Sequence, residues 1–113
     1  MPRLIRKRLV PASVVMVRLP AEIDSSNADH VRQQLCTALT PGVRIVVADL
    51  TTTTFCDVAG VRALARARAC ATARNTELRL AVRPGPVRRV LLMISPGGAF
   101  LLYASTGEAV TGP

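Results

Sequence analysis

The sequence predicts a single α/β domain in which helices pack against a four- or five-stranded mixed sheet. Its 113 residues are about the usual length of one domain, and half of them are apolar. The spacing of the apolar residues switches several times between about 2 and about 3.6, which is typical of alternating strands and helices. Aromatic residues make up only 3% of the chain. The core is therefore expected to consist of valine, leucine, isoleucine and alanine.

The first part of the chain predicts strands followed by a helix. Residues 1–10 predict either an edge strand over Leu4–Val10 or a flexible basic N-terminus. Val14–Leu19 predicts a firmer strand, because Pro20 closes its apolar run. A helix is expected near residues 26–40, and its start and stop signals are a capping box of Ser26 and Asp29 and the pair Pro41-Gly42.

The middle of the chain predicts the centre of the sheet and a second helix. Val43–Leu50 is expected to be the central strand, because its apolar residues run without alternation, as in a strand covered on both faces. The second helix is expected near residues 58–74, and Asn75 suits the left-handed position after its end. Its apolar face is predicted to hold Val58, Val61, Leu64, Ala65, Ala69 and Ala73.

The last part predicts a strand over Leu78–Val82, a helix near residues 86–95 that begins at Pro86 and stops at Pro96-Gly97-Gly98, and a strand over Phe100–Tyr103. Ser105–Val110 predicts a terminal helical turn. The expected core consists of Val31, Leu35, Val46, Val47, Val61, Leu64, Leu80, Val90 and Leu91.

The charge of the chain favours solvated arginines over a nucleic-acid surface. Fifteen basic and seven acidic residues give a net charge of +8. The arginines are spread from Arg3 to Arg89 and no aromatic residues interleave with them, so we expect no nucleic-acid partner. No apolar run reaches the roughly 18 residues that cross a bilayer. Pro11 and Ser13 interrupt the stretch behind the basic N-terminus, which argues against export and favours the cytoplasm.

The cysteine and histidine content predicts no metal site. Cys36, Cys56 and Cys70 are scattered and odd in number, which argues against a disulfide framework and fits buried thiols in a reducing compartment. His30 is the single histidine and is expected to be solvated. We also find no glycine-rich phosphate loop, nucleophile elbow or catalytic carboxylate pair, since Asp49 and Asp57 are separated by a loop. The sequence therefore predicts neither an enzyme nor a bound cofactor.

The most informative segment is the loop between the central strand and the second helix. Crevices outside the carboxyl ends of strands are where α/β proteins place their binding sites. Asp57 is predicted to cap the helix, because its carboxylate can accept from the first free amides. Gly60 allows a close approach of backbone. Capping alone and a functional role remain equal alternatives for Asp57.

At these residues the chain resembles the STAS family, which comprises anti-sigma factor antagonists and related domains of sulfate transporters. The resemblance covers nearly the whole chain. It is carried by Val14–Leu19 followed by Ala21-Glu22-Ile23-Asp24, by Asn27-Ala28 with Val31–Leu35, by Asp49-Leu50 with the Phe55-x-Asp57-x-x-Gly60 motif, by Leu78–Leu80 and by Val87–Leu91.

The resemblance implies regulation by partner binding. An unmodified antagonist of this family binds an anti-sigma factor that is also an ATP-dependent serine kinase, which frees the sigma factor. Phosphorylation of the serine after the motif's aspartate weakens that complex, because a phosphate adds charge and bulk to the docking surface.

The sequence departs from the family at the phosphoacceptor. That position matches Val58, which has no hydroxyl, and the next position, usually Ser or Thr, matches Ala59. The early glycine is replaced by Ala21, and the usual Gly-Leu after the third helix is replaced by Pro96-Gly97-Gly98. We therefore expect a module that cannot be switched at Val58.

The leading hypothesis is an anti-sigma factor antagonist-like interaction module. Its expected interface consists of Asp24, Cys56, Asp57, Val58, Ala59, Gly60 and Arg62. The alternative is a STAS scaffold or an auxiliary subunit of a transporter or signalling complex. A homodimer is compatible with both hypotheses.

Overall fold

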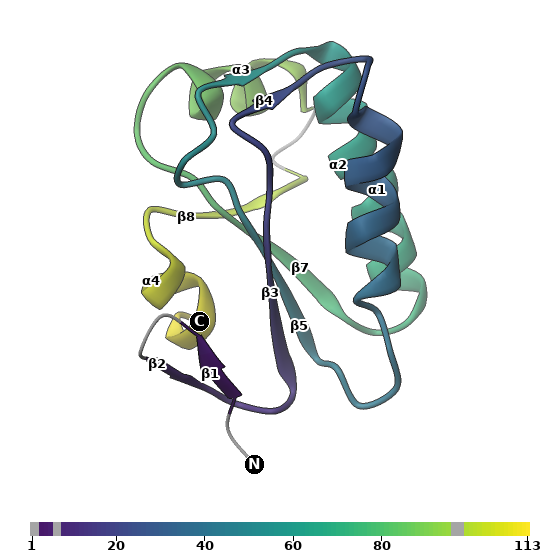
Figure 1. Ribbon diagram of the computed structural model, residues 1–113, viewed down its shortest axis with the longest axis vertical. Helices are drawn as coiled ribbons and strands as arrows, with labels where there is room; N and C mark the ends of the chain where they lie inside the picture. The colour runs from purple at the N-terminus through teal and green to yellow at the C-terminus, as the bar shows by residue number, and fades with distance from the viewer. Residues whose placement is uncertain (1–2, 6–7, 96–98) are drawn as a thin grey trace.

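Four parallel strands form the central sheet of the protein (Figure 1). The structure is a computed structural model that describes residues 3–5, 8–95 and 99–113. The strand order is β3 (Val14–Arg18), β5 (Ile45–Asp49), β7 (Glu77–Ala81) and β8 (Leu101–Tyr103), and each neighbouring pair is parallel. The predicted single α/β domain is confirmed, and the strand expected at the centre lies inside the sheet.

The N-terminal residues pair with one another instead of with this sheet. In place of a single strand over Leu4–Val10, β1 (Arg3–Ile5) and β2 (Arg8–Val10) form a separate antiparallel pair. The four-stranded sheet is entirely parallel, and the antiparallel pairing is confined to this separate two-stranded sheet.

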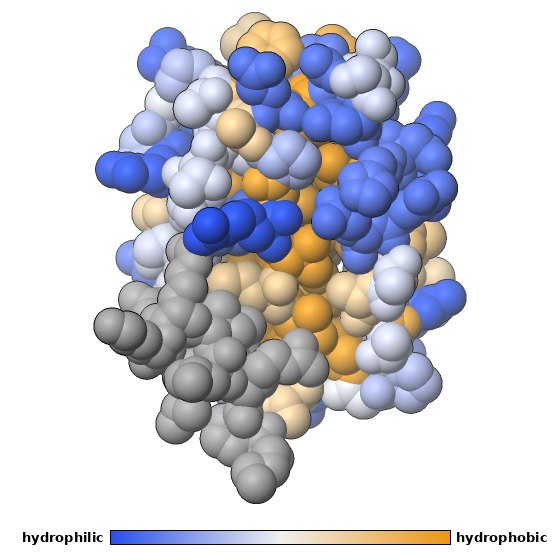
Figure 2. Space-filling view, in the orientation of Figure 1, coloured by the Kyte–Doolittle hydropathy of each residue, from blue (hydrophilic) through white to orange (hydrophobic). Residues whose placement is uncertain are grey.

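The three longer helices cover one face of the sheet, and the short C-terminal helix covers the other. The long helices are α1 (Ala28–Thr37), α2 (Val58–Ala73) and α3 (Pro86–Ile94). Alternate residues of β5 point to opposite faces, so Val46 joins the core beneath these helices while Val47 joins a second cluster with Ala109 of α4 (Thr106–Thr111). Figure 2 shows hydrophilic residues on the side of α1 and hydrophobic residues along the middle of the same view.

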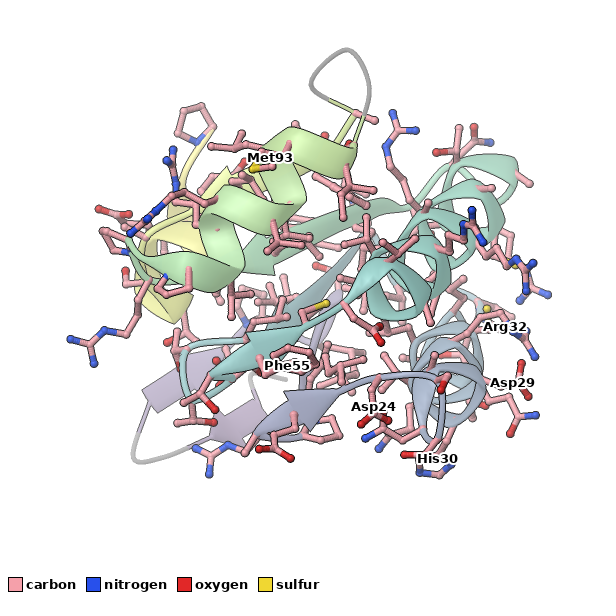
Figure 3. The ribbon with its side chains drawn as sticks, turned by 90° about the horizontal axis from the view of Figure 1, so that it is seen from above. Asp24, Asp29, His30, Arg32, Phe55 and Met93 are labelled. Carbon is pink, nitrogen blue, oxygen red and sulfur yellow. The ribbon has the colours of Figure 1, made fainter. Side chains whose placement is uncertain are left out.

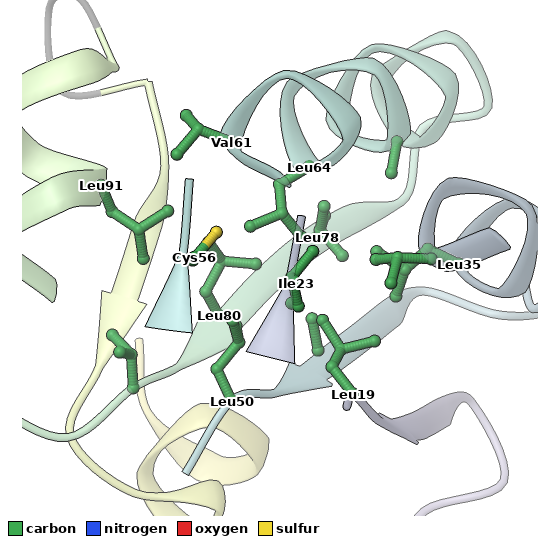
Figure 4. Packing of buried hydrophobic residues seen from close by; sticks show 14 of the residues in the cluster. Leu19, Ile23, Leu35, Leu50, Cys56, Val61, Leu64, Leu78, Leu80 and Leu91 are labelled. Atoms are coloured by element: carbon green, nitrogen blue, oxygen red, sulfur yellow. The ribbon is translucent and has the colours of Figure 1, made fainter. Parts of the chain in front are cut away.

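The main core is built from branched aliphatic side chains, as the low aromatic content requires. Ile23, Leu35, Leu64 and Leu80 are fully buried and lie together in Figure 4. Every residue of the predicted core is buried except Val90, which is half-buried and packs against the cluster from α3.

Two details of the helices differ from the prediction. The capping box at Ser26 and Asp29 is absent, because α1 begins after Asn27 and Asp29 instead accepts hydrogen bonds from Arg32 and Gln33. The buried face of α2 is also rotated from the predicted one. Ala65, Ala69 and Ala73 are exposed, whereas the buried residues are Gly60, Val61, Ala63, Leu64, Ala67 and Ala71.

Ser105 and Glu108 cap the start of the C-terminal helix. The Ser105 hydroxyl accepts from the Glu108 amide at 3.1 Å, and the Glu108 carboxylate accepts from the Ala104 amide at 3.1 Å. This explains why six residues form a regular helix there. Two other predicted helix signals are confirmed, with Pro86 in the first turn of α3 and Asn75 at a φ of 57°. The first helix, however, ends at Thr37, before the predicted stop signal Pro41-Gly42. The predicted stop signal Pro96-Gly97-Gly98 lies outside the described residues.

Arg79 fastens the C-terminal helix to the sheet. Its side chain lies on β7 and is almost completely buried. The guanidinium donates to the carbonyl oxygens of Ala109 (3.0 Å) and Gly112 (2.7 Å), and it forms an ion pair of 2.8 Å with Glu77. It also lies over the Tyr103 ring, 5.1 Å from the centroid. The burial of this charge is thus offset by several partners at once.

Candidate functional site

A second, very short pair of strands brings two distant loops together beyond the main sheet. β4 (Glu22–Ile23) and β6 (Phe55–Cys56) are parallel, with Ile23 opposite Cys56. The Asp57 amide donates to the Ile23 carbonyl at 3.2 Å, which continues the pairing by one step. The register therefore places Asp24 beside Asp57, so two of the predicted site residues lie together although 33 positions separate them.

Asp57 caps α2 as predicted. Its Oδ1 accepts a hydrogen bond of 3.0 Å from the Gly60 amide, and its backbone is extended, as an N-cap requires. Gly60 is buried against Ile23 and Cys56. A Cβ at Gly60 would lie 2.6 Å from Cys56 Sγ and 2.9 Å from Ile23 Cγ2. The absence of a side chain at residue 60 is therefore what lets the start of α2 lie directly on β4 and β6.

Asp24 organises the turn that leads into α1. Its Oδ1 accepts hydrogen bonds from the Ser26 hydroxyl and, at 2.9 Å, from the Ser26 amide. These two bonds lower the pKa of the Asp24 carboxyl below its ordinary value. Asn27 closes the turn, because its Oδ1 accepts from the Asp24 amide at 3.0 Å. The carboxylate of Asp24 is thus held in place and charged beside the start of α2.

The residues from Phe55 to Ala59 are divided between the core and the surface. Cys56 is buried, and burial, assisted by the neighbouring Asp57 charge, raises its thiol pKa to about 11. Phe55 and Val58 point outward, with 49% and 45% of their surfaces exposed, and Ala59 is half-buried. Figure 3 shows Phe55 on β6, with Asp24 between it and α1. Cys56 therefore supports this surface from below, whereas Val58 is accessible to a partner.

Arg62 lies one turn further along α2, at a groove between α1 and α2. The groove has a volume of about 280 Å³, and Asp29, Arg32 and Arg66 also line it. Arg32 forms an ion pair of 3.0 Å with Asp29. Arg62 thus lies one turn from Ala59 on α2. It faces the groove between α1 and α2, whereas Asp24 and Asp57 lie where β4 pairs with β6.

Three surface residues were not predicted for the site. Phe55 belongs to the motif but not to the expected interface, and it is exposed because Cys56 takes the inward position of the two-residue strand β6. Arg32 and Arg66 adjoin Arg62 because α1 packs beside α2, which is a tertiary contact. The four-residue spacing of Arg62 and Arg66 was the available signal in the sequence.

The cysteines and His30 are placed as follows. Cys56 is buried as expected, but Cys36 is only half-buried and Cys70 is exposed, because it projects from the outer side of α2. His30 is exposed, as predicted.

Within residues 3–5, 8–95 and 99–113, no group of three metal-ligating side chains comes together. In the same described part of the chain, none of the helices has both the length and the apolar character needed to span a bilayer.

Several solved structures have folds similar to this one. The anti-sigma factor antagonist SpoIIAA in its unphosphorylated form aligns with a TM-score of 0.60 and 21% identity over 89% of this chain and 88% of that chain. A sulfate transporter family protein from Wolinella succinogenes aligns with a TM-score of 0.66 and 14% identity over 92% and 87% of the two chains. The murine anion transporter Slc26a9 aligns with a TM-score of 0.66 and 20% identity over 88% of this chain.

This chain spans only 17% of the length of the Slc26a9 chain. At these identities the alignments establish the shared fold. The comparison with curated proteins finds no match. The model of the STAS domain matches residues 7–109, which is almost the whole sequence. The chain therefore belongs to the STAS domain family.

Proposed function

We propose that this protein is a cytoplasmic anti-sigma factor antagonist-like module that binds an ATP-binding anti-sigma factor of the serine-kinase type and thereby releases a sigma factor. STAS domains are generally protein-interaction modules without enzymatic activity. The observation that carries the proposal is the pairing of β4 with β6, which brings Asp24 beside Asp57 at the start of α2. The similarity of the fold to that of SpoIIAA supports it.

The proposed interface surrounds the first turn of α2. Asp24 supplies a fixed carboxylate and Val58 an exposed apolar side chain, while Asp57 and Gly60 hold the first turn in position. Arg62 extends this interface along α2. Ala59 and the buried Cys56 contribute shape rather than polar contacts.

We further propose that phosphorylation does not switch this interface. Val58 occupies the position of the family's phosphoacceptor and has no hydroxyl. Among the preceding threonines, three hydroxyls donate hydrogen bonds close by, from Thr51 to Asp49, from Thr53 to the Pro20 carbonyl and from Thr54 to the Ala21 carbonyl. A nucleophile displaced by about 1 Å can lose a large factor in rate. A bound kinase is therefore expected to leave these hydroxyls unmodified.

The test combines binding with mass spectrometry. The protein is mixed with an ATP-binding anti-sigma factor of the serine-kinase type, with and without ATP, and the complex is measured by size-exclusion chromatography. We expect a complex that persists in ATP and a wild-type chain of unchanged mass. Val58→Ser is expected to gain one phosphate and then to bind more weakly, whereas the control Val58→Ala remains unmodified.

The outcomes separate the proposal from its alternative. A phosphate on Thr54 of the wild-type chain, accompanied by release of the partner, would contradict the lack of a switch. Failure to bind any anti-sigma factor, together with capture of transporter subunits, would favour the auxiliary-subunit function.

A further inference from the structure

The groove between α1 and α2 has an apolar floor and a positively charged rim. Its floor consists of small residues, Ala28 from α1 and Ala59 and Ala63 from α2, which leave space that a larger side chain would fill. Its rim carries three arginines, Arg32, Arg62 and Arg66, against the single carboxylate of Asp29. The groove of about 280 Å³ thus combines apolar contact surface with an excess of two positive charges.

Two of these arginines have no partner among the residues that the structure describes. Arg32 is held by Asp29 at 3.0 Å, and Figure 3 shows both residues on the outer side of α1. Arg62 and Arg66 are exposed, and within the described part of the chain neither of them forms a hydrogen bond or an ion pair. Their guanidinium groups are therefore available to an external carboxylate.

We propose that this groove binds an acidic helix of a protein partner, with two carboxylates one helical turn apart and small apolar residues between them. Arg62 and Arg66 are four residues apart on α2, so they are separated by about 6 Å along the helix axis. Carboxylates at positions i and i+4 of a docked helix have the same separation. The small residues of the docked helix would rest on the alanine floor.

This inference rests on the proposed function, because the acidic helix would belong to the same partner that contacts Asp57 and Val58. It refines that interface, because Asp24 would repel an acidic segment whereas the groove attracts one. The acidic helix is therefore expected to lie along α1 and α2, and a different part of the partner is expected to face Asp24.

The groove fits a protein helix better than a nucleic acid. The described residues that line it include no aromatic side chain on which a base could stack. The exposed Phe55 lies on β6, and it is not among the residues that line the groove.

The test uses a synthetic probe and the full chain. The probe is an alanine-rich peptide of about 16 residues, long enough to populate a helix, with glutamates at i and i+4 on one face. A control peptide has the same composition with its glutamates scattered around the helix. The ¹⁵N-labelled protein is titrated with each peptide, and amide chemical shifts are followed at low and at moderate salt.

We expect shift changes confined to the amides around Ala28, Ala59 and Ala63, and weaker binding of the scattered control peptide. Each exposed ion pair changes an equilibrium constant up to about fivefold, and the double variant Arg62→Glu/Arg66→Glu also replaces two attractions by repulsions. It is therefore expected to bind about tenfold more weakly. The variant Arg88→Glu/Arg89→Glu has the same change in net charge on α3 and is expected to bind within about twofold of wild type. A lysine version of the peptide is expected to bind the Arg62/Arg66 variant.

Equal effects of the two double variants would overturn the proposal, because binding would then depend on net charge alone. Equal shifts at the same amides with a single-stranded oligonucleotide would also overturn it. The titration contains no anti-sigma factor, so its failure is distinguishable from failure of the proposed function. Unchanged dispersion of the amide spectrum verifies that each variant remains folded.

Discussion

Replacing Gly60 by alanine tests whether the start of α2 depends on close contact with β4 and β6. In an exposed helix interior, alanine is more stable than glycine by about 1 kcal/mol. At Gly60, however, the added Cβ would meet Cys56 Sγ at 2.6 Å, Ile23 Cγ2 at 2.9 Å and the Ile23 carbonyl oxygen at 3.3 Å. Both neighbouring side chains are buried, so they have little room to move away.

The expected outcome is a balance of these two effects. Overpacking of a well-packed core costs about 1–3 kcal/mol. After the gain in helix propensity is subtracted, Gly60→Ala is expected to lower the free energy of unfolding by about 1 kcal/mol. Urea denaturation followed by circular dichroism measures this change as a lower midpoint with an unchanged m-value.

Two further variants isolate the contact. Ala65→Gly, at an exposed position of α2, reports helix propensity alone and is expected to cost about 1 kcal/mol. Cys56→Ala removes the atom that a Cβ at residue 60 would meet first, so the cost of Gly60→Ala is expected to shrink in that background. If Gly60→Ala stabilises the wild-type chain by about as much as Ala65→Gly destabilises it, the argument from close contact is wrong.

Three more perturbations follow from the structure. Asp57→Ala is expected to lower the free energy of unfolding, measured by urea denaturation, by about 1 kcal/mol through loss of the N-cap. A larger loss of binding free energy for the partner would assign Asp57 to the interface. Equal losses of stability and of binding would leave Asp57 with capping alone. Arg79→Met is expected to lower the free energy of unfolding by about 3 kcal/mol, because it leaves the carbonyls of Ala109 and Gly112 without their donor; an unchanged denaturation midpoint would contradict this. The raised pKa of Cys56 means that the folded state retains its thiol proton when the unfolded state loses it, so stability is expected to fall as the pH rises from about 9 to about 11. Cys56→Ala is expected to flatten that decline, and an equally steep one would remove Cys56 as its cause.

Much of the fold was predictable because the chain gives strong local signals. The unbroken apolar run around Val46 identified the central strand, and Asp57, Asn75 and Pro86 marked helix ends through their own backbone and side-chain chemistry. The capping box predicted at Ser26 and Asp29 does not form, because the Ser26 hydroxyl donates to Asp24 and is not available to α1. At a similar pattern, Ser105 does cap a helix, and the Glu108 carboxylate accepts from the amide of Ala104.

The face of α2 was mispredicted because alanines carry little information about burial. Ala65 and Ala69 fit a helical spacing as well as Ala63 and Ala67 do, and only the packing of α1 and β7 against α2 decides between the two sets. The pairing of β4 with β6 and the groove at Arg62 are likewise tertiary features. The cap at Asp57 and the burial of Cys56 were thus predictable from the sequence, whereas the exposure of Phe55 and the groove at Arg62 were not.

The anchoring of Arg79 also bears on the order in which the protein can complete its fold during synthesis. The guanidinium emerges with β7, but its two carbonyl partners come from residues 109 and 112, at least 30 positions later. Until those residues leave the ribosome, Arg79 must stay hydrated or rely on Glu77 and the Tyr103 ring, and the face of the sheet at Val47 and Ala81 lacks the cover of α4. The face of the sheet that packs against α1 and α2 can therefore form early on the nascent chain. The opposite face is covered by α4 only after residue 112 has left the ribosome.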